Sequence, residues 1–184
     1  EKKRWARARL VEVLEPSPDR REPPCAYARD CGGCQWQHID LDRQRALKRE
    51  ILIGQLQHLA GIEDPPVEEV RGVGPEDGFG YRNHVVMTID DQGRAGYVRA
   101  GTHDPIAVDH CPVLHPLLRE WHEALPPLEG VRKLELRVGT RTAQRLAMTR
   151  GRPSAESAEA AANRGIPLVP SGGGEITEMV GTHK

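Results

Sequence analysis

Hydrophobic and polar residues alternate in several stretches of the chain, which is the pattern of half-buried β-strands. Within residues 81–89, one side of such a strand would carry Tyr81, Val85, Met87 and Ile89, and the other would carry Arg82, His84 and Thr88. Residues 90–93 have the composition of a turn that folds this strand into a hairpin. The expected strands are residues 81–89, 95–99, 106–108, 131–138 and 144–150. We therefore expect two β-hairpins with a short strand between them.

Other segments carry apolar residues at the three- and four-residue spacing of an amphipathic helix. The longest follows Asp40, a residue type that caps helix starts, and ends at Gly61. Its apolar positions, which predict a face packed against other parts of the fold, are Leu47, Ile51, Leu52, Leu56 and Leu59. Shorter helices are expected around Trp121 and over residues 154–164. Together these elements predict an α+β fold, with an antiparallel β-sheet, flanking helices and a cysteine-rich loop.

The ends of the chain suggest that it continues in a longer protein. Residues 5–14 alternate loosely, as the last strand of a preceding β-domain would, and the prolines within residues 16–24 form a stiff connector. Another strand is expected at residues 175–180, shortly before Lys184. We therefore expect both ends to be cut.

Composition narrows the class of protein. Hydrophobic residues make up 38% of the 184 residues and charged residues 29%, and the net charge is −1. The chain has no apolar run long enough for a transmembrane helix, and its overall charge does not indicate a nucleic-acid partner. Such a partner would have to meet a local patch, as at Lys2, Lys3 and Arg4 around Trp5. The alternative for these basic residues is a solvated strand or tail.

The cysteines carry the most specific signal. Cys25, Cys31 and Cys34 lie within ten residues, and Cys111 stands alone before a proline. Thiolates are soft ligands for zinc or iron–sulfur iron, and a three-plus-one division favours a [4Fe-4S] cluster. Structural zinc sites with four cysteines usually have two C-x2-C pairs, whereas this chain has one. Zinc, disulfides and unrelated buried thiols remain alternatives.

Two further functions fit the same cysteines. One is a small iron–sulfur electron carrier without any role for RNA, although the chain has cysteines for one cluster alone. The other is a zinc-stabilised module that binds RNA or protein. In each case the expectation of reduced thiols, together with the lack of a signal peptide, favours the cytoplasm.

A family resemblance extends over essentially the whole chain. It rests on residues 25–38 (C-x5-C-GG-C-QWQH), on Gln44 and Lys48, on residues 80–83 (GYRN) and on residues 110–112 (HCP). Together these resemble the iron–sulfur-containing RNA uracil-5-methyltransferases, which are bacterial enzymes that make 5-methyluridine in 23S rRNA or tRNA. The resemblance implies an enzyme that methylates RNA with S-adenosylmethionine as methyl donor.

The resemblance also implies a division into domains. Residues 1–16 resemble the end of an OB-like TRAM domain that binds RNA, residues 17–24 are a linker, and residues 25–184 resemble a cluster-bearing central domain. The domain with the S-adenosylmethionine pocket, the nucleophilic cysteine and the carboxylate base would follow Lys184. Since the resemblance assigns every cysteine to the cluster, the chain alone should not catalyse methyl transfer.

The resemblance implies that the pair Tyr81 and Arg82 lies near the RNA path. Trp36, Gln37 and His38 could meet a base or merely pack, and Arg82 could grip a phosphate through two hydrogen bonds. The alternative for Arg82 is an ion pair with an acid such as Asp90 or Asp91. The expected RNA-binding residues are Lys2, Lys3, Arg4, Trp36, Gln37, His38, Tyr81 and Arg82.

Overall fold

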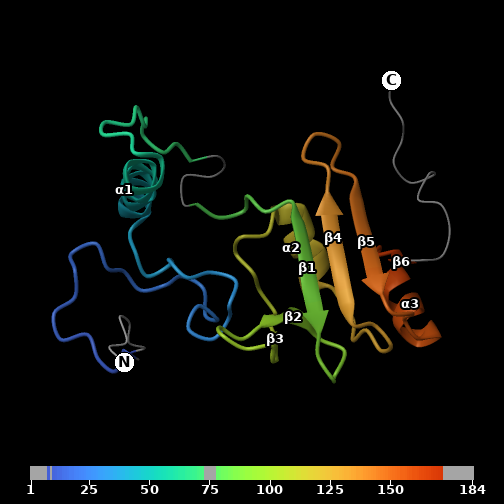
Figure 1. Cartoon of the computed structure of the whole chain (residues 1–184). Coiled ribbons are helices and arrows are strands. Elements are labelled where there is room, and N and C mark those ends of the chain that lie inside the picture. The colour runs from blue at the N-terminus through green and yellow to red at the C-terminus, as the bar shows by residue number, and fades with distance from the viewer. Residues whose placement is uncertain (1–7, 9, 73–77, 172–184) are drawn as a thin grey trace, which may run out of the picture.

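The computed structural model describes residue 8 and residues 10–72 and 78–171, and within these it has an α+β fold. The helices are α1 (Leu41–Ala60), α2 (Pro116–Glu123) and α3 (Ala155–Ala162). The strands are β1 (His84–Ile89), β2 (Ala95–Val98), β3 (Pro105–Ala107), β4 (Lys133–Val138), β5 (Arg145–Arg150) and β6 (Leu168–Pro170). Both expected hairpins and all three expected helices are present, with ends shifted by a few residues (Figure 1).

The strands form one sheet in the order β3-β2-β1-β4-β5-β6. Every neighbouring pair is antiparallel except β5 and β6, which are parallel. The expectation of an antiparallel sheet is therefore wrong at this edge. Helix α3 connects β5 to β6, and a helical crossover of this kind returns the chain in the same direction. The three residues of β6 are too few to show a period in the sequence.

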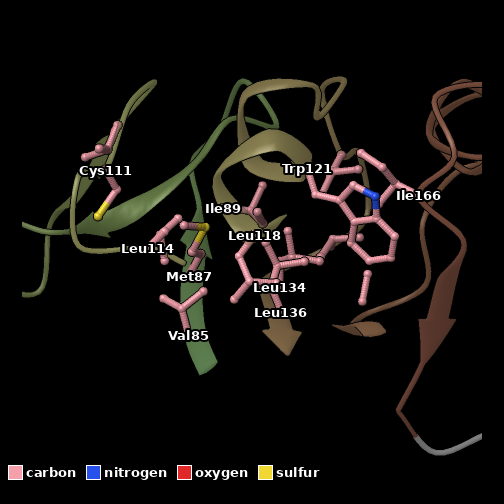
Figure 2. Packing of buried hydrophobic residues seen from close by; sticks show 14 of the residues in the cluster. Val85, Met87, Ile89, Cys111, Leu114, Leu118, Trp121, Leu134, Leu136 and Ile166 are labelled. Carbon is pink, nitrogen blue, oxygen red and sulfur yellow. The ribbon is translucent and has the colours of Figure 1, made fainter. Parts of the chain in front are cut away.

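The hydrophobic core fills the space between one face of the sheet and α2 (Figure 2). Met87 of β1 pairs with Leu134 of β4, and both side chains are fully buried. Leu118 and Trp121 of α2 cover them from the helix side. The expected alternation is confirmed within β1, since Val85, Met87 and Ile89 are buried while His84 and Val86 are exposed. It does not extend to Tyr81, which lies before the strand and is 49% exposed. This packed sheet is the support on which the cysteine-bearing segments lie.

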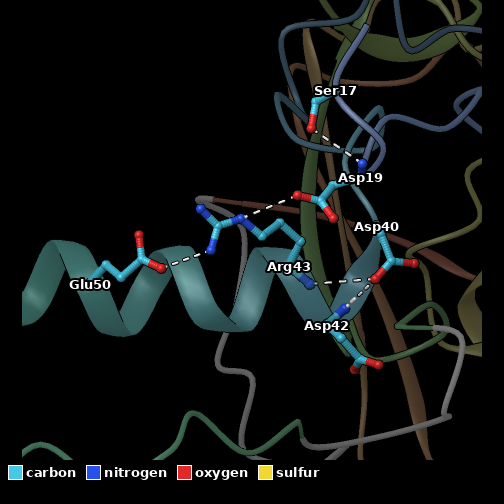
Figure 3. A network of polar contacts seen from close by, with 6 residues as sticks. All are labelled: Ser17, Asp19, Asp40, Asp42, Arg43 and Glu50. Atoms are coloured by element: carbon cyan, nitrogen blue, oxygen red, sulfur yellow. Dashed lines mark hydrogen bonds and ion pairs between the residues drawn. The ribbon is translucent and has the colours of Figure 1, made fainter.

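Helix α1 has the expected ends but not the expected packing. The Asp40 side chain accepts hydrogen bonds from the Asp42 and Arg43 amides, and Gly61 takes the left-handed conformation that closes the helix. Arg43 then joins Asp19 to Glu50 through two ion pairs (Figure 3). None of the helix residues is buried, so the prediction of a packed apolar face is wrong. The helix lies apart from the sheet (Figure 1).

Some expectations fall at the ends of the chain. Residues 8 and 10–14 form no strand, and the remainder of the segment expected to close a TRAM-like domain lies outside the described residues. Lys2, Lys3 and Arg4, and the strand expected at residues 175–180, also lie outside them. The TRAM assignment and the domain boundaries stay predictions. Among the described residues, no helix has the length and apolar character needed to cross a bilayer.

Candidate functional site

The cysteine loop, residues 25–34, is fastened to the end of β2. The Gly32 amide donates a 2.9 Å hydrogen bond to the Val98 carbonyl, and Cys31 forms an antiparallel bridge with Arg99. Gly32 lies so close to β2 that an added Cβ would be 3.1 Å from the Val98 oxygen. A larger residue at this point would require the neighbouring backbone to shift by a few tenths of an ångström, because the two backbones lie close together. The loop is thus held against the sheet by Cys31 and Gly32.

The segment that carries Cys111 follows β3 and is fixed from two sides. The Cys111 carbonyl accepts a hydrogen bond from the Leu114 amide, and residues 80–82 run alongside residues 112–114. The Arg82 amide, for example, donates to the Val113 carbonyl at 2.9 Å. Cys111 itself is 7% exposed and packs with the core. This explains how a residue far away in the sequence is brought to the cysteine loop.

The four cysteines line one small pocket, which we call the cysteine pocket. None of them is in a disulfide. Burial raises the pKa values of the Cys25 and Cys31 thiols, and the nearby charges of the other cysteines raise them further. No group of three or more His, Cys, Asp or Glu side chains in the described part of the chain is arranged to hold a single metal ion. The cluster assignment therefore stays a prediction, while the convergence of the thiols is a property of the fold.

Polar groups also face the cysteine pocket. The Tyr97 hydroxyl donates a 3.3 Å hydrogen bond to the Cys111 sulfur. Burial raises the pKa of Tyr97, the Cys111 charge raises it further, and the Arg82 guanidinium lowers it. Gln37, which is 9% exposed, accepts a hydrogen bond from the Cys25 amide. Sequence reasoning missed Tyr97, because one tyrosine in a short strand carries no signal of its own.

Arg82 lies where neither expected role is evident from its contacts. It lines the cysteine pocket, half-buried, with its charge close to Tyr97. One of the two acids considered as its partner, Asp90, is paired with Arg94 at 2.9 Å instead. The contact of Arg82 with phosphate stays a prediction. The structure adds a different feature, which is that the positive charge of Arg82 lies at the same pocket as the four cysteines.

Beside the cysteine pocket lies a second hollow of about 310 Å³, which we call the aromatic cleft. Cys34 and Gln37 line both hollows. Three expected RNA-binding residues, Trp36, Gln37 and Tyr81, line the cleft. His38 lines a different hollow together with Arg43. The residues of the cleft that sequence reasoning did not assign to RNA include Arg21, Phe79 and Lys48. Phe79 is the sole phenylalanine of the chain. Its rarity was the one feature of the sequence that could have drawn attention to it as a candidate site residue.

Comparison with known proteins identifies the region. No family model matches the chain. An uncharacterised RNA methyltransferase from Nostoc is 37% identical over 162 residues, which is 78% of this chain and 35% of that protein. The chain is homologous to part of an RNA methyltransferase. The 23S rRNA (uracil(1939)-C(5))-methyltransferase RlmD of Pseudomonas entomophila is 39% identical over 122 residues, 65% of this chain and 27% of that protein.

These relationships confirm the resemblance to RNA uracil-5-methyltransferases. A Pyrococcus abyssi tRNA (uracil-54, C5)-methyltransferase, solved with S-adenosyl-L-homocysteine, shares the fold with a TM-score of 0.53. It is 24% identical, and the match covers 81% of this chain and 37% of that one. The chain spans about a third of the length of the curated relatives it matches. Its RNA methyltransferase relatives therefore contain large regions beyond the part compared.

Proposed function

We propose that this chain is the cluster-holding and RNA-binding part of an RNA uracil-5-methyltransferase that uses S-adenosylmethionine. The observation that carries the proposal is the meeting of the four cysteines, from two distant segments, at one pocket in a chain homologous to RNA methyltransferases. The whole protein would methylate a uridine of 23S rRNA or tRNA. None of the described residues is assigned to the methyl donor or to the chemical step.

The donor set of the cysteine pocket suits a [4Fe-4S] cluster. Four free thiols are the usual ligands of such a cluster, and Cys25, Cys31, Cys34 and Cys111 would supply them. Cluster binding would join the cysteine loop to the segment after β3 and could also supply a one-electron redox centre. Arg82 would offset part of the negative charge that four thiolates bring, because its guanidinium lies at the same pocket.

The role of this region for RNA follows from the cost of the reaction. A target base must leave its stack before an enzyme can reach it, at a cost of a few kcal/mol. A rigid domain that grips neighbouring nucleotides helps to offset that cost. The aromatic cleft beside the cysteine pocket is where we expect this grip. An electron carrier without RNA would have no use for it.

The proposal is tested by purifying the chain without oxygen and measuring iron, acid-labile sulfide and RNA binding. We expect close to four irons and four sulfides per chain, broad absorption near ~400 nm, and RNA affinity that falls as salt rises. Colourless protein with one zinc would support the zinc module instead. A loaded cluster without any RNA binding would support the electron carrier.

Tyr97→Phe tests the hydrogen bond at the cysteine pocket. A hydrogen bond to a ligand sulfur stabilises the more negative, reduced form of a cluster, so its loss should lower the reduction potential. A net worth of about 1 kcal/mol corresponds to a fall of roughly 40 mV for one electron. The measurement is a redox titration of the iron signal in the anaerobic protein.

Tyr27→Phe is the matched control for Tyr97→Phe. The Tyr27 ring also lines the cysteine pocket, but its hydroxyl donates to Asp109 at 3.1 Å rather than to sulfur. We expect this variant to keep the potential of the unmodified chain. Equal shifts in both variants would mean that the Tyr97 hydroxyl has no specific effect on the sulfur.

A further inference from the structure

The aromatic cleft combines flat rings with positive charge. Trp36, Phe79 and Tyr81 line it together with Arg21 and Lys48. Among the residues that the structure describes, none that lines it is a carboxylate. This absence of acid is informative because the chain as a whole has slightly more acidic than basic residues, with 27 against 26. The cleft is therefore a local site for an anion that also carries a flat ring.

The two cations of the cleft are available for a ligand. In the part of the chain that the structure describes, Arg43 pairs with Asp19 and Glu50, and Arg45 pairs with Asp42. Lys48 has no such partner there, although it lies on the same helix. Arg21 uses its Nε to donate to the Gln37 carbonyl and likewise meets no carboxylate in the described chain. A phosphate would give both cations a counter-charge.

The walls of the cleft are held in place before any ligand binds. Gln44 of α1 donates to the Trp36 and Ile39 carbonyls at 3.0 and 2.9 Å, which fixes the backbone turn that carries Trp36. On the other wall, the Gly80 amide donates to the Pro112 carbonyl beside Tyr81. Tyr81 is 49% exposed, so part of its side chain remains accessible to a partner. Preorganised walls reduce the entropy that the site itself must lose when a ligand binds.

From these features we propose that the aromatic cleft binds one unpaired nucleotide of an RNA strand. The base stacks on the aromatic side chains, and Arg21 and Lys48 bind the adjoining phosphates. Stacking platforms next to cations are how proteins hold single-stranded nucleic acid. The volume of about 310 Å³ lies at the lower end of the range for ligand pockets, which suits one nucleotide. This inference rests on the proposed function and adds the site and the unpaired state of the ligand.

The site lies directly against the cysteine pocket, because Cys34 and Gln37 line both. Gln37 joins them physically, since it accepts a hydrogen bond from the Cys25 amide. Holding the cysteine loop in shape would therefore also hold one wall of the cleft. We expect the nucleotide to bind best when the cysteine loop is ordered.

Binding of fluorescein-labelled decauridylate to the anaerobically prepared chain tests the cleft. Tyr81→Ala should weaken binding about tenfold, because it removes one stacking surface. Lys48→Ala should weaken it several-fold and reduce the slope of log affinity against log salt by about 0.7, the value for one phosphate contact on a single strand. Lys133→Ala is the matched control, since Lys133 is an exposed lysine on β4 and away from the cleft. It should leave affinity and slope unchanged.

Two more arms separate the possible ligands. A decamer with abasic positions should bind about tenfold more weakly than decauridylate, because phosphates alone cannot stack. Uridine monophosphate should bind far more weakly than the decamer; equal affinity would overturn the assignment to an RNA strand. RNA should also quench tryptophan fluorescence in the unmodified chain but much less in Trp36→Phe, which keeps a ring and removes the indole.

The outcomes distinguish this inference from the proposed function. If decauridylate binds the unmodified chain with salt dependence, but Tyr81→Ala and Lys48→Ala match Lys133→Ala, the cleft is not the site and RNA binds elsewhere on the chain. If the unmodified chain binds no RNA at all, the proposed RNA role fails together with the cleft. The circular dichroism spectrum of each variant should match that of the unmodified chain. A match shows that a loss of RNA affinity is not due to unfolding.

Discussion

Cys111→Ser should reduce the iron content of the chain from about four atoms to nearly none and remove its absorption near ~400 nm. Serine keeps the shape of cysteine but offers an oxygen, which is a poor ligand for iron–sulfur iron. Because Cys111 is the one cysteine that comes from outside the loop, its loss should also release the loop from the segment after β3. We expect the melting temperature to fall by about 10 °C, since metal binding and folding free energy are coupled.

His110→Ser is the matched control for Cys111→Ser. His110 is the neighbouring residue, and its side chain is exposed and paired with Glu123 on the surface. Histidine can replace cysteine as a ligand in some clusters, so this variant also tests His110 as an alternative ligand. We expect it to keep its iron and colour. Full iron content in Cys111→Ser with an unchanged spectrum would overturn the four-cysteine assignment.

The elements that sequence reasoning predicted well are those with a clear period. The alternation through Val85, Met87 and Ile89 correctly gave β1 and its buried face. Edge strand β6 was missed because it forms a strand only through its pairing with β5, which is a tertiary contact. The apolar spacing in α1 correctly predicted a helix but not its surroundings. Spacing reports that a helix has an apolar stripe, whereas burial depends on what another part of the chain or a partner places there.

The candidate site was predictable in its residues and not in its arrangement. The spacing of the cysteines marked all four as candidate ligands, and the structure brings them to one pocket. The placing of Arg82 on the polar side of a strand over residues 81–89 assumed that the strand began before it. In the structure β1 begins at His84, and Arg82 lies in a bridge with Leu114, so the alternation does not extend to it. Its approach to Tyr97 depends on that crossing of segments, which no local pattern reveals.

Gly96→Ala should be among the most destabilising single changes in the sheet. Gly96 of β2 is buried and lies opposite Ala107 of β3, and an added Cβ would overlap the Ile106 carbonyl oxygen. This neighbour is backbone, so it can move only if the two strands separate. Overpacking of this kind costs up to about 3 kcal/mol, and we expect the melting temperature to fall by roughly 6–12 °C.

The same change should reach the cysteine pocket, which is why it tests the link between fold and site. Strand β3 leads directly to Cys111. Displacement of β3 should therefore lower the iron content of the anaerobically prepared protein and make the remaining iron easier to lose on exposure to oxygen. Gly54→Ala is the matched control, because it adds the same methyl group within α1, where an added Cβ meets nothing within 4 Å. That variant should be neutral or more stable by about 0.5–1 kcal/mol, because alanine favours a helix interior. If Gly96→Ala instead melts with the unmodified chain and keeps its iron, β2 and β3 do not approach as closely as the structure has them, and the path from the sheet to Cys111 must be redrawn.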